Sequence, residues 1–136
     1  MIQVIHGLKG SGKTKRIIDM ANESIKQQKG DVVFVDDDNR YMFDLRHEIR
    51  FVNAGEYNMA GPEMLYGFLC GMLAQNFDVT LVFIDAFLKL VHAKPEDTEW
   101  FFKSLESLSA KRNINFVLSV SMDDADAPDF IRKYFI

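Results

Sequence analysis

Short apolar runs, rich in β-branched and aromatic residues, recur along the chain and are separated by longer stretches with helical periodicity. Each run is bounded by turn residues, a pattern typical of buried β-strands. The pattern predicts five strands, at residues 2–6, 31–35, 48–52, 79–84 and 114–121.

Two of the intervening stretches place most of their apolar residues along one broad side of a helix. The first predicted helix begins near Lys13 and ends before Gly30, a residue type suited to the left-handed position that follows a helix. The second spans residues 62–77 and presents a wide apolar face able to cover a sheet. Residues 126–136 are predicted to form a short helix that closes the sheet.

A third helix is predicted to start near Pro95, because the fixed φ of proline suits a first helical turn. Its buried side is predicted to hold Trp100, Phe101, Leu105 and Leu108. Phe102 falls one step off this stripe. With the apolar residues at 134–136, Phe102 is a candidate for a small exposed patch through which the chain associates with itself, as a homo-oligomer, or with a protein partner.

The alternation of strands and helices favours a parallel sheet, because parallel neighbours are joined by crossover helices that cover both faces. We therefore expect an α/β fold, a three-layer sandwich with a mostly parallel five-stranded sheet. No repeat, low-complexity tract or linker divides the sequence, so residues 1–136 are expected to form one domain. Sheets of this kind bind ligands at the carboxyl ends of their strands, where candidate chemistry is therefore sought.

Composition narrows the class of protein further. The chain has 136 residues, 48% of them hydrophobic and 26% charged, with a formal net charge of −4, values typical of one globular domain. A single cysteine, Cys70, excludes both an internal disulfide and a zinc site built from cysteines. No apolar run is long enough to cross a membrane, and 20 acidic against 16 basic residues argue against nucleic acid as a partner. We expect a cytoplasmic protein.

A glycine-rich motif directly follows the first predicted strand and opens into the first predicted helix. It reads Gly7, Leu8, Lys9, Gly10, Ser11, Gly12, Lys13 and Thr14, which fits G-x-x-x-x-G-K-[ST] at every position. The glycines let the backbone wrap with its N–H groups inward, Lys13 can reach the β- and γ-phosphates, and the Thr14 hydroxyl can bind Mg²⁺. Three cations in the first helical turn are unfavourable unless an anion binds there.

Two other interpretations of this segment stay open. It can be a glycine-rich turn with solvated lysines and no ligand. It can also be a dinucleotide site, with Asp36 at the end of the second strand as the ribose-binding acid. The glycine spacing is G-x-x-G-x-G, however, and this alternative gives Lys13 and Thr14 no role.

On these residues the chain resembles the P-loop nucleoside triphosphatase superfamily, with residues 7–14 as its Walker A motif. Residues 80–85 resemble a Walker B strand, an apolar run that ends in an acid, Asp85, which contacts Mg²⁺. The resemblance implies ATP and Mg²⁺ as cofactors, Thr14 and Asp85 as metal ligands, and Lys13 and Asp85 as catalytic residues. ATP is favoured over GTP because the guanine-specific N-K-x-D pattern is absent.

The order of elements also resembles the thymidine kinase branch, which has a RecA-like core, with residues 52–57 similar to the turn before its Walker B strand. In that kinase an acidic residue directly after the Walker B aspartate is the catalytic base, whereas Ala86 occupies this position here. The short chain resembles small bacterial ATP-binding proteins. Together these resemblances imply ATP binding with slow or partner-dependent hydrolysis; the alternatives are a nucleotide-dependent switch without turnover and a degenerate nucleoside or small-molecule kinase.

Further polar residues end the second and the last predicted strands, on the same sheet edge as the glycine-rich motif. Asp36, Asp37 and Asp38 follow the second strand, and Asp123 and Asp124 follow the last. One of these acids can serve as a base, but solvated turn residues are the favoured interpretation, least so for Asp36. By resemblance, Ser119 or Ser121 can sense the γ-phosphate.

Arg40 can approach phosphate or pair with a neighbouring aspartate at the surface. The histidines lack metal-ligand spacing, and His6 is expected to be a buried, hydrogen-bonded residue beside the motif.

Overall fold

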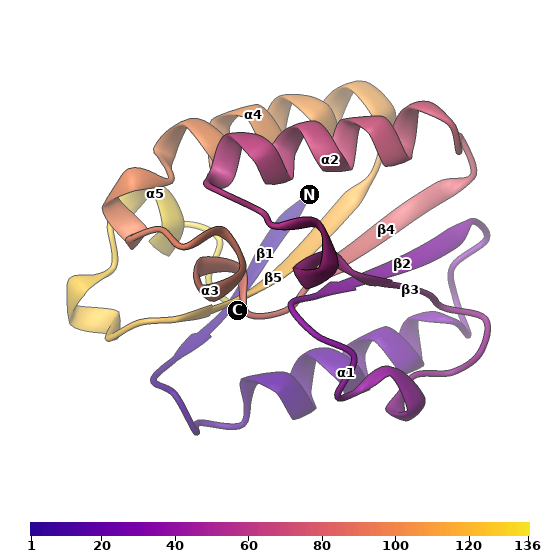
Figure 1. Cartoon of the computed structure of the whole chain (residues 1–136), viewed down its shortest axis with the longest axis horizontal. Coiled ribbons are helices and arrows are strands. Elements are labelled where there is room, and N and C mark those ends of the chain that lie inside the picture. The colour runs from indigo at the N-terminus through magenta and orange to yellow at the C-terminus, as the bar shows by residue number, and fades with distance from the viewer.

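A computed structural model describes all 136 residues and shows an α/β fold built on one sheet (Figure 1). The sheet has five strands, every neighbouring pair is parallel, and the order across it is β1-β5-β4-β2-β3. The strands are β1 (Ile2–Gly7), β2 (Asp31–Asp36), β3 (Arg50–Asn53), β4 (Val79–Ile84) and β5 (Asn115–Ser121). The prediction of an α/β fold with five strands is confirmed, and the sheet is parallel throughout.

Helices cover the two faces of the sheet unequally (Figure 1). The longer helices are α1 (Lys13–Ser24), α2 (Pro62–Ala74) and α4 (Glu99–Arg112), and the shorter ones are α3 (Phe87–Val91) and α5 (Asp129–Arg132). Single 3-10 turns are η1 (Met42–Asp44), η2 (Ala54–Tyr57), η3 (Pro95–Asp97) and η4 (Asp124–Asp126). Helix α1 lies against one face, and the other helices lie against the opposite face, so the chain forms three layers.

Each face has its own apolar core, as a parallel sheet buried on both sides requires. Ten buried residues, among them Ile17, Phe34 and Phe83, fill the core under α1. Twenty-five fill the larger core under the other helices, where Leu65 and Phe101 are fully buried. The sheet is therefore held rigid from both sides, which fixes the positions of the residues at the carboxyl ends of its strands.

Helix α4 differs from its prediction. It begins at Glu99, because Pro95 opens a separate 3-10 turn, η3, rather than the helix itself. The buried side therefore holds Phe101, Phe102 and Leu105, while Trp100 is 50% exposed. The predicted burial of Trp100 and exposure of Phe102 are both wrong.

Because α4 begins at Glu99, its aromatic residues make contacts that differ from the predicted ones. Trp100 packs edge-on against Tyr66 of α2, and Phe102 stacks on Tyr134. Phe102 thus belongs to the core and forms no exposed patch for self-association.

The C-terminal segment also differs in part from its prediction. Helix α5 is only four residues long, and the chain after it runs beside β1. The Val4 N–H donates to the Tyr134 carbonyl at 2.8 Å, and the Ile136 N–H donates to the Val4 carbonyl at 3.0 Å. The segment therefore covers part of the β1 edge as a strand would.

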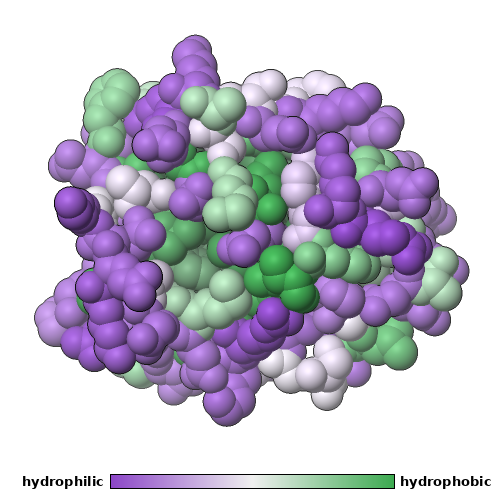
Figure 2. Space-filling model, turned by 180° about the vertical axis from the view of Figure 1, so that it is seen from behind, coloured by the Kyte–Doolittle hydropathy of each residue, from purple (hydrophilic) through white to green (hydrophobic).

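The face seen from behind is mostly hydrophilic, with hydrophobic side chains gathered toward its middle (Figure 2). No helix in the chain combines the length and the apolar character needed to span a membrane.

Candidate functional site

The glycine-rich segment forms a tight loop between β1 and α1, at the lower left of Figure 1. Gly7 has φ 143° and Gly12 has φ 88°, values that other L-residues rarely adopt. A Cβ atom on Gly7 would lie 2.7 Å from the Ser11 hydroxyl oxygen. The loop conformation therefore requires glycine at both ends.

The first turn of α1 offers hydrogen-bond donors that no residue of the chain uses. Gly12 is the N-cap residue and has no side chain to cap the helix. The backbone N–H groups of Lys13, Thr14 and Lys15 donate to no carbonyl of the loop. These N–H groups lie at the positive end of the helix dipole and are open to solvent, an arrangement that suits an anion.

Lys13 folds back over this loop. Its ammonium group donates to the Leu8 carbonyl at 2.8 Å and to the Ser11 hydroxyl at 3.3 Å. Partial burial lowers the pKa of Lys13, while the charge of Asp85 acts in the opposite direction. A phosphate group in the loop would be a stronger acceptor for this ammonium than a carbonyl.

Asp85 directly follows β4, and its side chain reaches the first turn of α1. It is 3% exposed, and its Oδ2 accepts a hydrogen bond from the Thr14 hydroxyl at 3.1 Å. Its Oδ1 accepts from the Ser119 hydroxyl, which in turn accepts from the Ala86 N–H at 2.8 Å. Strand β5 lies between β1 and β4 in the sheet, which explains why Ser119 can hold Asp85 in place.

Thr14 and Asp85 together fit a Mg²⁺ ion by their donor chemistry. Mg²⁺ prefers oxygen ligands, and it is commonly bound by one or two protein oxygens together with phosphate oxygens. A hydroxyl oxygen and a carboxylate oxygen 3.1 Å apart, beside an anion-binding loop, match this preference. The structure brings these two predicted metal ligands together although 71 positions separate them in the sequence.

Asp36 ends β2 next to β4 and is buried, with 2% of its surface exposed. Its Oδ1 accepts from the Asp37 N–H at 2.7 Å, but its Oδ2 has no partner as a carboxylate. Burial, a hydrogen bond with the Asp37 side chain, and the negative charges of Asp85 and Asp37 raise the pKa of Asp36 to about 8. The raised pKa favours the neutral form of Asp36 at neutral pH, which sets this buried residue apart from the solvated turn residue expected from the sequence.

Asp37 remains the charged member of this pair. Burial alone raises the pKa of Asp37, but the hydrogen bond from Asp36 and the ion pair with Lys89 outweigh it and lower that pKa. The Lys89 ammonium lies 3.0 Å from the Asp37 carboxylate. The Gly55 backbone packs against the Asp37 carbonyl so closely that a Cβ atom there would lie 2.0 Å from it. The position of Asp37 is thus fixed on two sides.

Asp36, Asp37 and Asp38 can bring one carboxylate oxygen each within 4.8 Å of one another, a spacing that suits a cation. Their charges are already balanced within the chain. The raised pKa of Asp36 favours its neutral form, Asp37 pairs with Lys89, and Asp38 pairs with Arg40 at 3.1 Å. The pairing of Arg40 with a neighbouring aspartate confirms the surface interpretation of that residue.

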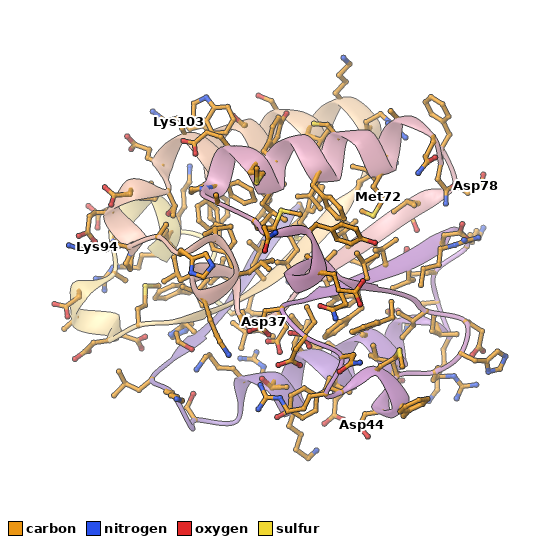
Figure 3. All side chains as sticks on the ribbon, in the orientation of Figure 1. Asp37, Asp44, Met72, Asp78, Lys94 and Lys103 are labelled. Atoms are coloured by element: carbon orange, nitrogen blue, oxygen red, sulfur yellow. The ribbon has the colours of Figure 1, made fainter.

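A cleft of about 820 Å³ opens above the loop and Asp85. One wall comes from α1, a second from α3, and a third from the connection between β2 and β3. Figure 3 shows Asp37, the first residue of that connection, at the end of the sheet, and Asp44, in the 3-10 turn η1 halfway along it, beside α1. Besides the loop, the cleft is lined by Lys15, Ile18, Asp19, Asn22, Arg40, Tyr41, Asp44, Asp85, Ala86, Leu88, Lys89, Ser119 and Ser121.

Two other residues considered in the sequence, Asp123 and His6, do not line the cleft. Asp123 accepts from the Ala125 N–H, as expected of a turn residue. His6 is half-buried rather than buried; its Nδ1 lies 2.7 Å from Asp124, and its ring stacks on Phe135. The prediction of a hydrogen-bonded His6 is confirmed, while full burial is wrong, because β1 is an edge strand that only the C-terminal segment covers.

Several residues that line the cleft were missed in the sequence, among them Asn22, Tyr41 and Lys89. Lys89 lies on α3, a short helix without a periodic pattern long enough to detect. Tyr41 and Asn22 carry no motif, and only their place in the fold brings them to the cleft. Asn22 joins two elements, since its side chain bonds to the Asp44 carbonyl at 2.9 Å and to the Arg46 N–H at 2.8 Å.

Comparison with known proteins adds no family to this description: no protein-family model matches the chain, and no curated protein matches it in sequence.

Proposed function

We propose that the chain is a P-loop protein that binds a nucleoside triphosphate, ATP, with Mg²⁺, and hydrolyses it slowly or only with a partner. The observation that carries this proposal is the hydrogen bond between Thr14 and Asp85. It joins the glycine-rich loop after β1 to an acid that follows β4, two strands away in the sheet, as a shared Mg²⁺ site requires. The free N–H groups of the first α1 turn support the same proposal, because they match the oxygens of a phosphate chain.

Each residue of the site then has a separate task. The loop N–H groups would hold the α- and β-phosphates, and the Lys13 ammonium, which donates to the Leu8 carbonyl, would bind the β- and γ-phosphates instead. Thr14 and Asp85 would hold Mg²⁺, which neutralises charge on the β- and γ-oxygens when bound. Ser119 keeps the Asp85 carboxylate oriented by donating to its other oxygen.

Slow hydrolysis follows from what stands beside Asp85. Ala86 has no side chain that can orient or deprotonate water, and its left-handed backbone directs its N–H to Ser119. Asp36 is protonated and does not line the cleft. Loss of a water-positioning group or of an arginine that stabilises the transition state lowers phosphoryl-transfer rates by roughly 10³ to 10⁵, which a partner can restore.

Calorimetric titration tests the binding proposal. The wild-type protein is titrated with ATP in the presence and absence of Mg²⁺, beside Lys13→Ala and the control Lys29→Ala, a solvent-exposed lysine beyond the end of α1. Loss of charge-assisted contacts worth about 1.5–3 kcal/mol should weaken binding to Lys13→Ala by roughly 10- to 100-fold. Equal affinities for the two variants, or no binding to wild type, would contradict the proposal.

A nucleotide-dependent switch is the second candidate, and one contact favours it. Helix α3 begins directly after Asp85 and Ala86, and its Lys89 holds Asp37 across the site. A ligand at Asp85 is therefore next to a short helix that contacts a second strand end. Tight ATP binding without ADP release, together with nucleotide-dependent capture of a partner, would support the switch over the hydrolase.

A further inference from the structure

Helix α2 is apolar on the side that faces away from the sheet, where a surface helix is ordinarily polar. Its buried residues are Pro62, Leu65, Leu69 and Leu73. Its exposed residues are Glu63, Met64, Gly67, Gly71 and Ala74. Glu63 is the only charged residue among positions 60–77. An exposed apolar side of this kind indicates a surface that another molecule covers.

Two glycines lie at the centre of this outer side. Gly67 and Gly71 are four positions apart, so they are neighbours on the helix surface. A Cβ atom added to either glycine would have no atom within 4 Å, so packing within the chain requires neither of them. Neither has a positive φ, and glycine within a helix is unfavourable relative to alanine. The two glycines do provide a flat strip on which a second helix can approach closely.

Larger apolar side chains border the strip. On one flank Phe68 packs against Tyr57 of η2, and on the other Tyr66 packs against Trp100 of α4. Met64, Tyr57 and Trp100 each remain about half exposed. Aromatic residues and methionine are enriched in the centres of protein–protein interfaces. We refer to these side chains and the glycine strip together as the α2 surface.

Helix α4 lies beside this surface and runs in the same direction as α2 (Figure 1). Near the first turns of the two helices, Tyr66 contacts Trp100. Near their last turns, the Arg112 guanidinium donates to the Leu73 carbonyl at 3.0 Å. The N-terminal ends of the two helices therefore lie together, and so do the C-terminal ends.

The charges at these two ends differ in sign. At the N-terminal end most charged residues are acidic, and Lys103 there pairs with Glu99 at 3.9 Å. The acidic residues are Glu63, Glu96, Asp97 and Glu99, with Lys94 beside them. The charged residues at the C-terminal end are Lys111 and Arg112, with Asp78 beside them. The α2 surface therefore has an acidic end and a basic end.

We propose that the α2 surface binds the same surface of a second copy of this chain, with the two α2 helices antiparallel about a two-fold axis. Gly67 of one copy then lies against Gly71 of the other, as a self-complementary interface requires. The acidic end of each copy faces the basic end of the other, and the helix dipoles are opposed, whereas parallel helices would bring like charges together. The inference does not rest on the nucleotide site, because α1 and its loop lie on the opposite face of the sheet.

Sedimentation equilibrium of the full chain tests the proposal, at concentrations from about 1 μM to about 1 mM, a range that covers weak and moderate association. Wild type should change from monomer to dimer within this range. Gly67→Leu should fold, because the single chain leaves the space open, but should weaken association by about 10-fold or more, because the added side chain holds the helices apart. The control Glu23→Leu adds the same side chain at an exposed position of α1 and should dimerise as wild type does.

Charge reversal tests the antiparallel direction. Glu63→Lys and Lys111→Glu should each weaken the dimer by about 3- to 10-fold, and the double variant should recover most of the wild-type affinity. A wild type that stays monomeric at every concentration would overturn the proposal, as would be the case if the surface binds a different protein. Dimerisation of folded Gly67→Leu with wild-type affinity would place the interface elsewhere, and failure of the double variant to recover would refute the antiparallel arrangement.

Discussion

Replacement of Asp36 by asparagine should change how the stability of the fold depends on pH. The pKa of Asp36 is about 8 in the folded chain against an ordinary value of 3.8. Between these two pH values the folded state binds a proton that the unfolded state releases. The free energy of unfolding of the wild type therefore falls as pH rises from about 4 to about 8, by up to about 1.4 kcal/mol per pH unit.

The magnitude at pH 7 follows from the same two pKa values. Keeping Asp36 protonated in the folded chain costs about 4 kcal/mol at pH 7 relative to its ionised state in the unfolded chain. Asparagine has nearly the same shape, accepts from the Asp37 N–H, and offers its amide to the Asp37 carboxylate without this cost. Asp36→Asn should therefore be more stable than wild type by up to about 4 kcal/mol at pH 7, and nearly equal to it at pH 4.

Urea unfolding of the two proteins at several pH values between 4 and 9, without nucleotide or Mg²⁺, measures this difference. Effects of titrating groups that do not interact with Asp36 cancel when the variant is compared with wild type at each pH, whereas Asp37 and Asp85 are close enough to respond to the substitution. Asp126→Asn, at an exposed aspartate outside the cluster, is the matched control and should follow the wild-type curve. Parallel curves for Asp36→Asn and wild type would refute the assignment of a protonated Asp36.

Three further predictions concern the site and its support. Ser119→Ala should lower the free energy of unfolding by about 2 kcal/mol, because it removes a buried hydrogen bond to Asp85 and leaves the Ala86 N–H without an acceptor. The control Ser121→Ala, at an exposed position, should change the free energy of unfolding by less than about 0.5 kcal/mol. Gly55→Ala should destabilise the fold by about 1–3 kcal/mol, because the added Cβ clashes with the Asp37 carbonyl. Gly67→Ala should stabilise the fold by about 0.5–1 kcal/mol, because this glycine is exposed on α2 and no atom lies within 4 Å of the added Cβ. Urea unfolding measures both pairs, and equal effects within a pair would contradict the contacts described. ATP at 100 times its Kd, with Mg²⁺, should raise the free energy of unfolding by about 2.7 kcal/mol, which a thermal-shift assay detects. Chelation of Mg²⁺ should remove most of this gain. The same thermal shift with and without chelator would exclude a metal-dependent site.

The elements that the sequence predicts well are those with a strong local pattern. The five strands are β-branched runs bounded by turns, and each lies within a few residues of its predicted place. The phosphate-loop motif at residues 7–14 could be recognised in the sequence because all of its residues are consecutive in the chain. The meeting of Thr14 with Asp85 was predictable from resemblance and from the rule that parallel strand ends share one edge.

The elements that the sequence predicts poorly depend on contacts between distant segments. Trp100 and Phe102 exchanged their expected environments because the start of α4 is set by Thr98 and Glu99 after a separate turn, not by Pro95. The ion pair of Lys89 with Asp37 has no local signal, since 52 positions separate the two residues.

The protonation of Asp36 is likewise a tertiary property. It depends on burial between two strands and on two neighbouring carboxyl groups, one of which comes from another strand end. In the sequence the same residue is only one of three consecutive aspartates in a turn.

The central claim, that residues 7–14 and Asp85 bind a Mg²⁺-nucleoside triphosphate, is tested most directly by following backbone amide signals in an NMR titration. Wild-type protein labelled with ¹⁵N is titrated with Mg²⁺ and a slowly hydrolysed ATP analogue. The largest shifts are predicted at Gly10, Gly12, Lys13 and Thr14, with further shifts at Ala86, whose N–H bonds to the Ser119 hydroxyl that holds Asp85. Shifts that are absent, or that are confined to residues away from the loop and the cleft, would contradict the account.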